Sequence, residues 1–184
     1  PQRSDVLSVF SGLRPLVKGN ASSTSGLSRD HFIETSESGL ISITGGKWTT
    51  YRKMAEDAVK VAIQGGKLED RPCVSQDLPI HGAMQVPNYT DHGYYYGTDW
   101  EKIRALQKED PVLAEKIHPD LPYTKAEIVW AVREEMCMTV DDALSRRTRA
   151  ILLNAGAAIT AASTVAHLIA TELKEDLQWE QEQT

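Results

Sequence analysis

The sequence predicts an α+β protein, with a short antiparallel β segment followed by an all-helical C-terminal domain. Three observations predict this class. Residues 1–66 are rich in Gly, Ser and Thr and contain β-favouring runs, whereas residues 67–184 carry helical patterns with capping signatures. The charge divides at the same place, because the first part has a net charge of +2 and the second a net charge of −8. We therefore expect two domains, residues 1–66 and residues 67–184.

The composition is that of a globular protein, with 41% apolar and 25% charged residues over 184 positions. A net charge of −6 argues against a general nucleic-acid binder. Cys73 and Cys137 form no C-x-x-C motif, which excludes a zinc ribbon and fits a reducing compartment. His81, His92, His118 and His167 are scattered with no ligand spacing, so we expect no metal site. The chain begins without an initiator Met or a signal-peptide pattern, and we expect a piece of a longer protein.

Alternating apolar residues and turn signals predict three strands in the first part. These strands cover residues 5–17, 31–35 and 40–44. The last two form a hairpin through Glu37-Ser38-Gly39, where glycine allows a positive φ. A helix is expected from about Thr49 to Ile63, with an apolar stripe that begins at Tyr51. Two glycines, Gly65 and Gly66, should end it.

Three helix starts in the second part carry a capping signature, in which a Thr hydroxyl accepts a free N–H and an acid three residues later reaches back. The pairs are Thr98 with Glu101, Thr124 with Glu127, and Thr139 with Asp142. Residues 150–171 carry no charge and are long enough to span a membrane. Because Ala, Thr and Ser dominate there and Asn154 predicts a break, we expect a pair of buried helices.

The most informative stretch for function is Gly45-Gly46-Lys47-Trp48-Thr49-Thr50, between a strand and a helix. Paired glycines let the backbone approach a ligand closely, and a helix start offers free N–H groups and a positive dipole end. Lys47 adds a full positive charge. The alternative is a tight turn with an ordinary Thr cap. The stretch matches neither G-x-G-x-x-G nor a Walker loop.

Two arginines, Arg14 and Arg29, precede this stretch in the sequence. An arginine is suited to bidentate recognition of phosphate or carboxylate. The alternative is that both are ordinary surface cations.

Several motifs resemble the FAD-dependent glycerol-3-phosphate dehydrogenases. The C-terminal third of that family is matched by residues 11–16 (SGLRPL), 28–31 (SRDH) and 43–56 (ITGGKWTTYRKMAE). The helical C-terminal domain of the same family is matched by residues 129–136 (VWAVREEM) and 139–150 (TVDDALSRRTRA). The resemblance reaches to about residue 176 and keeps the order and spacing of the motifs.

The resemblance implies a set of site residues. Gly45, Gly46, Lys47, Trp48, Thr49 and Thr50 would contact the flavin, where a helix N-terminus stabilises the negative charge of the reduced ring. Arg14, Arg29 and Lys47 would bind glycerol 3-phosphate, and Arg14 would also be catalytic. No metal is implied. The dinucleotide-binding fingerprint of the family belongs to an N-terminal FAD domain that this chain lacks.

The resemblance also implies a reaction and partners. The family oxidises glycerol 3-phosphate to dihydroxyacetone phosphate, transfers hydride to FAD and passes electrons to quinone at a membrane surface. The absence of a D-x-D-x-D-G calcium loop favours a bacterial form, cytoplasmic and peripheral on the inner face of the cell membrane. A homodimer is one assembly we consider. The chain by itself is not expected to catalyse. The alternatives are an oxidase of the same family, with O2 as acceptor, and a non-catalytic helical interaction module.

Overall fold

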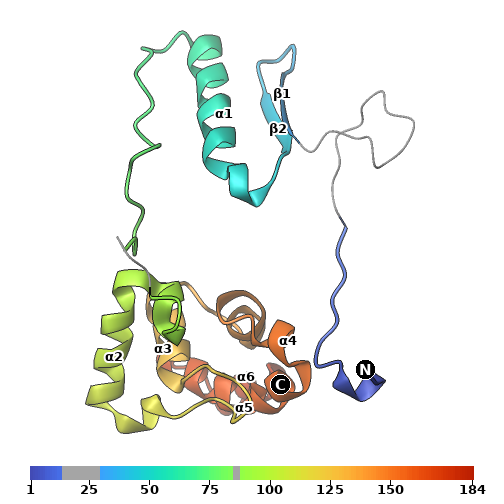
Figure 1. The fold of residues 1–184 in the computed structure, drawn as a ribbon, viewed down its shortest axis with the longest axis vertical. Coiled ribbons are helices and arrows are strands. Elements are labelled where there is room, and N and C mark those ends of the chain that lie inside the picture. The colour runs from blue at the N-terminus through green and yellow to red at the C-terminus, as the bar shows by residue number, and fades with distance from the viewer. Residues whose placement is uncertain (14–29, 85–87) are drawn as a thin grey trace. The chain divides into compact units, whose positions relative to one another are not determined.

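The computed structural model describes residues 1–13, 30–84 and 88–184 (Figure 1). The chain forms two compact units, Gly12–Ile80 and a second made of Pro1–Ser11 with His81–Thr184. We call them the hairpin unit and the helical unit. The predicted α+β class is confirmed, since a two-stranded antiparallel sheet precedes a run of helices. The boundaries of these compact units, at residues 11/12 and 80/81, differ from the predicted domain boundary after residue 66. The division into two domains at residue 66 stays a prediction.

The hairpin unit is built on strands β1 (His31–Thr35) and β2 (Ile41–Gly45). The strands pair antiparallel, with His31 opposite Gly45 and Ile33 opposite Ile43. Gly39 in the connecting turn has a φ of 85°, the left-handed conformation for which glycine is favoured. The predicted hairpin is therefore confirmed.

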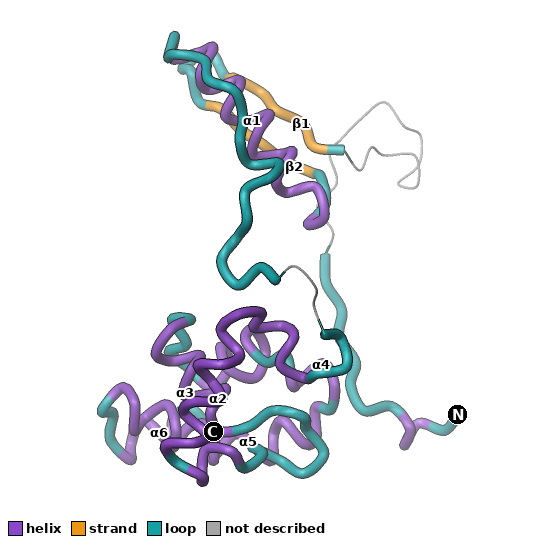
Figure 2. The backbone as a smooth tube through the Cα atoms, turned by 60° about the vertical axis from the view of Figure 1, so that its left-hand side comes forward, coloured by secondary structure: helices purple, strands orange, loops and turns teal. Residues whose placement is uncertain are grey.

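Helix α1 (Tyr51–Gly66) follows a 3₁₀ turn at Trp48–Thr50 and lies alongside the two strands in both views (Figures 1 and 2). The two glycines predicted to end it occupy its last turn, and the left-handed residue is Lys67, with a φ of 50°. None of the described residues of this unit is buried. Tyr51 on the predicted apolar stripe and Val59 beside it are 51% and 55% exposed, so the unit has no buried core of its own.

The strand predicted over residues 5–17 is wrong for residues 5–13. A short 3₁₀ turn at Arg3–Asp5 precedes irregular chain, and residues 14–17 lie outside the described residues. The backbone here bonds to helices instead of a strand. The N–H of Ala155 donates to the carbonyl of Leu7 at 3.0 Å, and the Ser8 hydroxyl donates to the carbonyl of Ile151 at 2.7 Å.

The helical unit contains five α-helices, α2 (Trp100–Glu109), α3 (Lys125–Glu134), α4 (Ala150–Leu153), α5 (Ala155–Leu173) and α6 (Leu177–Glu182). Among the described residues of this unit there are also three 3₁₀ segments, the turn at Arg3–Asp5, η4 (His92–Asp99) and η5 (Pro111–Ala114), and one π-helical segment, η6 (Asp142–Arg147). Its core gathers fully buried side chains from α3 and α5, among them Ile128, Val165 and Ile169. A second cluster forms around Ile103 and Trp130.

The capping predictions have three different outcomes. At α3 the prediction is confirmed, because Thr124 and Glu127 form a complete capping box. The box predicted at Thr98 is wrong, since Gly97 adopts a non-helical conformation with a φ of 55° and α2 begins only at Trp100.

The box predicted at Thr139 is half correct. The Thr139 hydroxyl accepts the N–H of Asp142 at 3.1 Å, as predicted. The Asp142 carboxylate, however, accepts the N–H of Met138 at 3.1 Å instead of that of Thr139.

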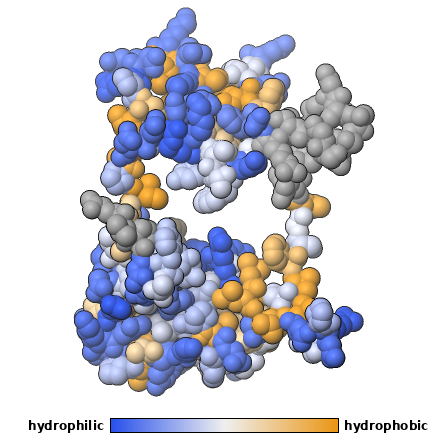
Figure 3. Space-filling model, in the orientation of Figure 1, coloured by the Kyte–Doolittle hydropathy of each residue, from blue (hydrophilic) through white to orange (hydrophobic). Residues whose placement is uncertain are grey.

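The uncharged stretch forms two helices that meet at Asn154, as predicted, with the Asn154 side chain accepting the N–H of Ala157 at 3.0 Å. Helix α5 is the one helix among the described residues that is long and apolar enough to cross a membrane. One face of it is buried in the helical unit, through seven residues that include Ala161 and Val165. Figure 3 shows a hydrophobic patch on the same unit. Leu152, Leu153 and Ile159 are among the exposed apolar side chains of this unit.

Candidate functional site

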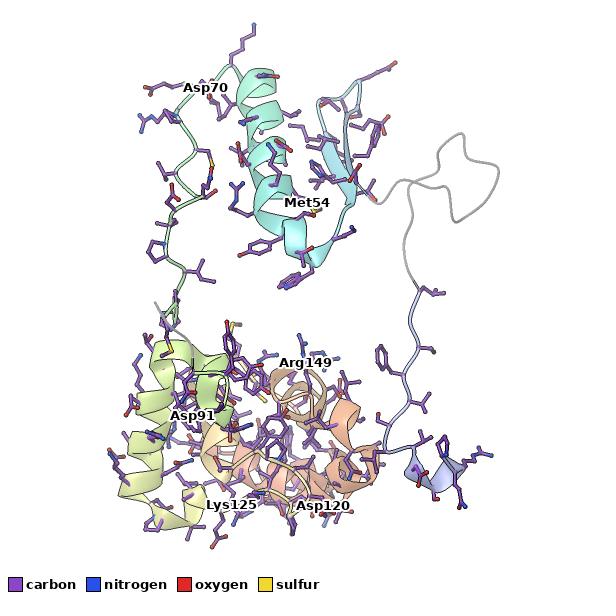
Figure 4. All side chains as sticks on the ribbon, viewed as in Figure 1. Met54, Asp70, Asp91, Asp120, Lys125 and Arg149 are labelled. Carbon is purple, nitrogen blue, oxygen red and sulfur yellow. The ribbon has the colours of Figure 1, made fainter. Side chains whose placement is uncertain are left out.

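The candidate site is the turn that joins β2 to α1. Gly45 and Gly46 have φ values of 75° and 76°, so the chain turns through two successive left-handed residues. A Cβ atom on Gly46 would lie 2.8 Å from Cε of Met54 and 3.3 Å from Cβ of His31. Figure 4 shows Met54 on the side of α1 that faces the strands. The glycine at position 46 therefore lets the turn pack against the helix.

The start of the helical segment is fixed by Thr50. Its hydroxyl accepts the N–H of Lys47 at 3.2 Å and donates to the carbonyl of Lys47 at 2.9 Å. The alternative in which Thr49 is the cap is therefore not what the structure shows. The N–H groups of Trp48 and Thr49 come first in the helical segment and receive no partner from the described residues. Two donors thus remain at the positive end of the helix dipole.

Lys47 and two aromatic rings surround these donors. The Lys47 side chain is exposed, and its ammonium group makes no ion pair within the described part of the chain. Trp48 is 86% exposed and stacks on Tyr51, with ring centroids 5.6 Å apart and an interplanar angle of 27°. A free cation, free N–H groups and a flat aromatic surface together suit a planar ligand that carries negative charge.

Charged residues of α1 form a network beside the turn that the sequence analysis did not identify. The Asp57 carboxylate contacts Nε2 of His31 at 3.0 Å and Nζ of Lys53 at 2.6 Å. The hydrogen bond from Lys53 lowers the pKa of Asp57, with a smaller contribution from His31. Asp57 therefore holds the imidazole of His31 next to the glycine turn. Its i,i+4 spacing from Lys53 was a signal that could have revealed the pair.

A second group on α1 is centred on Glu56. Its carboxylate accepts from Lys60 at 2.6 Å and from Arg52 at 3.0 Å, and these bonds lower the pKa of Glu56. Arg52 also donates to the Ser75 hydroxyl at 3.2 Å, which ties residues 67–80 to the helix. The cations of α1 are therefore paired, in contrast to Lys47.

The remaining predicted site residues cannot be placed in this geometry. Arg14 and Arg29 lie outside the described residues. Of the predicted set, the structure brings Gly45, Gly46, Lys47, Trp48, Thr49 and Thr50 together in one turn. Within residues 1–13, 30–84 and 88–184, no group of three or more His, Cys, Asp or Glu side chains could hold a metal ion.

Comparison with known proteins identifies the relatives of this chain. Residues 41–184 match the family described as the C-terminal domain of alpha-glycerophosphate oxidase. A mitochondrial glycerol-3-phosphate dehydrogenase of Arabidopsis thaliana is 34% identical, over 95% of this chain and 33% of the relative. A probable mitochondrial glycerol-3-phosphate dehydrogenase of Caenorhabditis elegans is 37% identical, over 94% of this chain and 27% of the relative.

The mitochondrial glycerol-3-phosphate dehydrogenase of Homo sapiens is 34% identical, over 99% of this chain and 28% of the relative. The chain thus spans between 27% and 33% of the length of these three relatives, although nearly all of it aligns with each of them. The resemblance found in the motifs is confirmed, and the chain belongs to the family defined by the C-terminal domain of alpha-glycerophosphate oxidase.

Proposed function

We propose that this chain is the C-terminal part of an FAD-dependent enzyme that oxidises sn-glycerol 3-phosphate to dihydroxyacetone phosphate. The observation that carries the proposal is the ammonium group of Lys47 at the start of a helix whose first two N–H groups, like this ammonium group, have no partner among the described residues. The names of the relatives supply the substrate class, since those reported above are glycerol-3-phosphate dehydrogenases.

The residues of the turn fit a flavin. The edge of a flavin ring carries oxygen and nitrogen acceptors, which need donors such as the N–H groups of Trp48 and Thr49. The exposed ring of Trp48 would cover apolar surface and exclude water. Lys47 and the positive end of the helix would stabilise negative charge on the ring. When bound, FAD would supply the acceptor for the hydride that leaves the substrate.

The basic residues would hold the substrate. Glycerol 3-phosphate carries a phosphate dianion, which three cations such as Arg14, Arg29 and Lys47 would bind and orient. Oxidation of its secondary alcohol removes a hydride from C2, which FAD would accept, and a proton from the hydroxyl group, which a base of the preceding domain would accept. We assign Arg14 a catalytic role, since a guanidinium group at C2 would stabilise negative charge on that oxygen.

The partners follow from the same family resemblance. We propose that a preceding FAD domain completes the site, that quinone takes up the electrons, and that the enzyme is peripheral on a membrane surface. We propose a bacterial form on the cytoplasmic face, although the relatives reported above are named mitochondrial. The isolated chain is proposed to be inactive.

A second candidate has an observation of its own in its favour. The family description names an oxidase, whereas the relatives are named dehydrogenases. In an oxidase, O2 instead of quinone would accept the electrons and would be reduced to hydrogen peroxide. Peroxide release at the same rate as glycerol 3-phosphate oxidation would assign the oxidase, and its absence in the presence of a quinone acceptor would assign the dehydrogenase.

The experiment is steady-state kinetics of Lys47→Met and Arg14→Met in the longer protein, with flavin content measured by absorbance. A charge-assisted contact to a phosphate is worth about 1.5–3 kcal/mol, so kcat/KM should fall roughly 10–150-fold while flavin stays bound. Lys67→Asn is the matched control, since it removes a positive charge at the opposite end of α1 and asparagine tolerates a left-handed backbone.

Two results would contradict the proposal. Near-normal kcat/KM in both variants would make these residues ordinary surface cations. A longer protein that purifies without flavin would instead support the alternative of a non-catalytic interaction module.

A further inference from the structure

The helical unit contains a cavity of about 540 Å³ that the proposed reaction does not use. Its walls come from η4, from Tyr123, from the residue after α3 and from residues 146–153. A volume of roughly 300–1,000 Å³ is typical of pockets for small molecules. We call it the arginine pocket, because Arg146, Arg147 and Arg149 all line it.

The positive charge of this pocket is only partly neutralised. Arg146 is paired with Asp141 and Asp142. Arg147 donates to two main-chain carbonyls beyond α3, from Nε to Glu135 at 2.8 Å and from Nη2 to Met136 at 3.3 Å. Carbonyl groups position this guanidinium without cancelling its charge.

The side chain of Arg149 does not stabilise the described part of the fold through a polar contact. Its side chain is exposed and makes no hydrogen bond or ion pair with the described residues. Figure 4 shows it at the surface of the helical unit. Its backbone is left-handed, with a φ of 57° and a ψ of 26°, a conformation that costs an arginine more than a glycine or an asparagine. Glycine or asparagine at position 149 would therefore make the turn between η6 and α4 more stable than arginine does.

The single acid in the lining is Glu135. It is half-buried, and burial raises its pKa above the ordinary range. The charge of Arg147, which also lines the pocket, acts on that pKa in the opposite direction. Since Arg146 is paired with carboxylates outside the lining, one carboxyl group in the lining leaves Arg147 and Arg149 with a net positive charge.

The rest of the lining is aromatic and aliphatic. Tyr95 is 63% exposed, while Tyr123 is buried and packs edge-on against His92, with ring centroids 5.3 Å apart. Leu152 and Leu153 are 42% and 50% exposed at the other side. The charge of Arg149 acts on the hydroxyl group of Tyr123, so the cationic and aromatic parts of the pocket adjoin.

From this arrangement we infer that the arginine pocket binds a compact anion carried on a flat apolar body. Arg149 supplies the free fork for the anion, Arg147 a second positive charge, and the tyrosine and leucine side chains cover the body. An aryl phosphate and an aryl carboxylate share this chemistry. The site lies within the helical unit and does not depend on flavin or on the turn at Lys47.

The test is an NMR titration of the full 184-residue chain with phenyl phosphate. We expect saturable shifts for the amides of residues 147–153 and of Tyr123. Phenol, which lacks the anion, and inorganic phosphate, which lacks the ring, should each bind at least tenfold more weakly. Benzoate distinguishes the two head groups, because a preference for it would assign a carboxylate ligand and a preference for phenyl phosphate a phosphate ligand.

The decisive variant is Arg149→Gly, because glycine favours the left-handed conformation and removes the guanidinium group together with the rest of the side chain. The melting temperature should stay equal or rise, while phenyl phosphate binding should weaken tenfold or more. Arg104→Met is the matched control, since it removes an arginine of the same unit that lies outside this pocket. Unchanged binding by Arg149→Gly, equal weakening by Arg104→Met, or inorganic phosphate binding as tightly as phenyl phosphate would overturn the inference.

Discussion

Nε2 of His92 lies 3.0 Å from Oε1 of Glu127, a carboxylate with no exposed surface. The same oxygen accepts the Tyr96 hydroxyl at 3.0 Å. The other oxygen accepts the N–H of Thr124 at 2.7 Å and its hydroxyl at 3.0 Å. Glu127 thus closes the cap of α3 and joins that helix to η4. Burial of this carboxyl group is compensated by the hydrogen bonds to both of its oxygens.

We predict that Glu127→Gln destabilises the helical unit by about 2–3 kcal/mol. The amide group keeps the shape of the side chain, but its NH2 would face donors where the carboxylate accepted them. Urea unfolding of the full chain, followed by circular dichroism, measures this. Glu134→Gln is the control on the same helix, because Glu134 is exposed. Equal stability of the two variants would mean that the network contributes little.

The second prediction concerns acid stability. The N–H of Met138, and after it the Thr139 side chain, lowers the pKa of Asp142. A carboxyl group whose pKa is lower in the folded state stabilises the fold above its unfolded pKa of about 4, and this contribution is lost as the pH falls through the folded pKa. In Asp142→Asn the free energy of unfolding should therefore fall less steeply as the pH drops below about 4.

Unfolding free energies measured at a series of pH values test this prediction. Asp120→Asn is the control, since Asp120 is largely exposed and its carboxylate comes no closer to Nδ1 of His118 than 3.9 Å. An acid limb of the same steepness in Asp142→Asn and in the unmodified chain would show that Asp142 does not contribute to it.

The third prediction distinguishes a core helix from a membrane span. Ala161 is 1% exposed on α5, while its neighbour Thr160 is exposed. Ala161→Leu should cost about 1–3 kcal/mol because it forces extra methylene groups into a packed site. Thr160→Leu should change the unfolding free energy by no more than about 0.5 kcal/mol. If both substitutions were tolerated equally, the buried face of α5 would not be a packed core.

Local chemistry made part of this fold predictable from the sequence. The capping box of Thr124 with Glu127 and the helix break at Asn154 were predicted correctly, because a cap depends on two or three neighbouring residues. The hairpin was correct because Gly39 and the flanking β-favouring runs act over ten residues. The Thr98 box failed because Gly97 packs closely against the backbone of Gly82, a contact that no nearby sequence signal reveals. The segment at residues 5–13 failed for the same reason, since its partners are residues 151 and 155.

The candidate site was predictable in composition but not in its surroundings. The Gly-Gly-Lys pattern and the helix after it indicated an anion-binding turn, and the structure places those residues together. It also shows that the Met54 side chain, eight positions later, packs against Gly46, which spacing alone did not suggest. The arginine pocket was missed entirely, because it joins Tyr123 to residues more than twenty positions away.

The last prediction is that residues 67–184 fold without residues 1–66 into a cooperative helical domain. All the buried side chains of the core clusters lie between Ile103 and Ile169. Removal of residues 1–66 loses the two described hydrogen bonds to Leu7 and from Ser8, each worth about 1 kcal/mol. The shorter chain should thus keep its helical circular dichroism and unfold in urea with about 1–2 kcal/mol less stability.

Residues 12–80 alone should show no cooperative transition, since none of their described side chains is buried. A random-coil spectrum for residues 67–184 would show that the helical unit depends on the part removed.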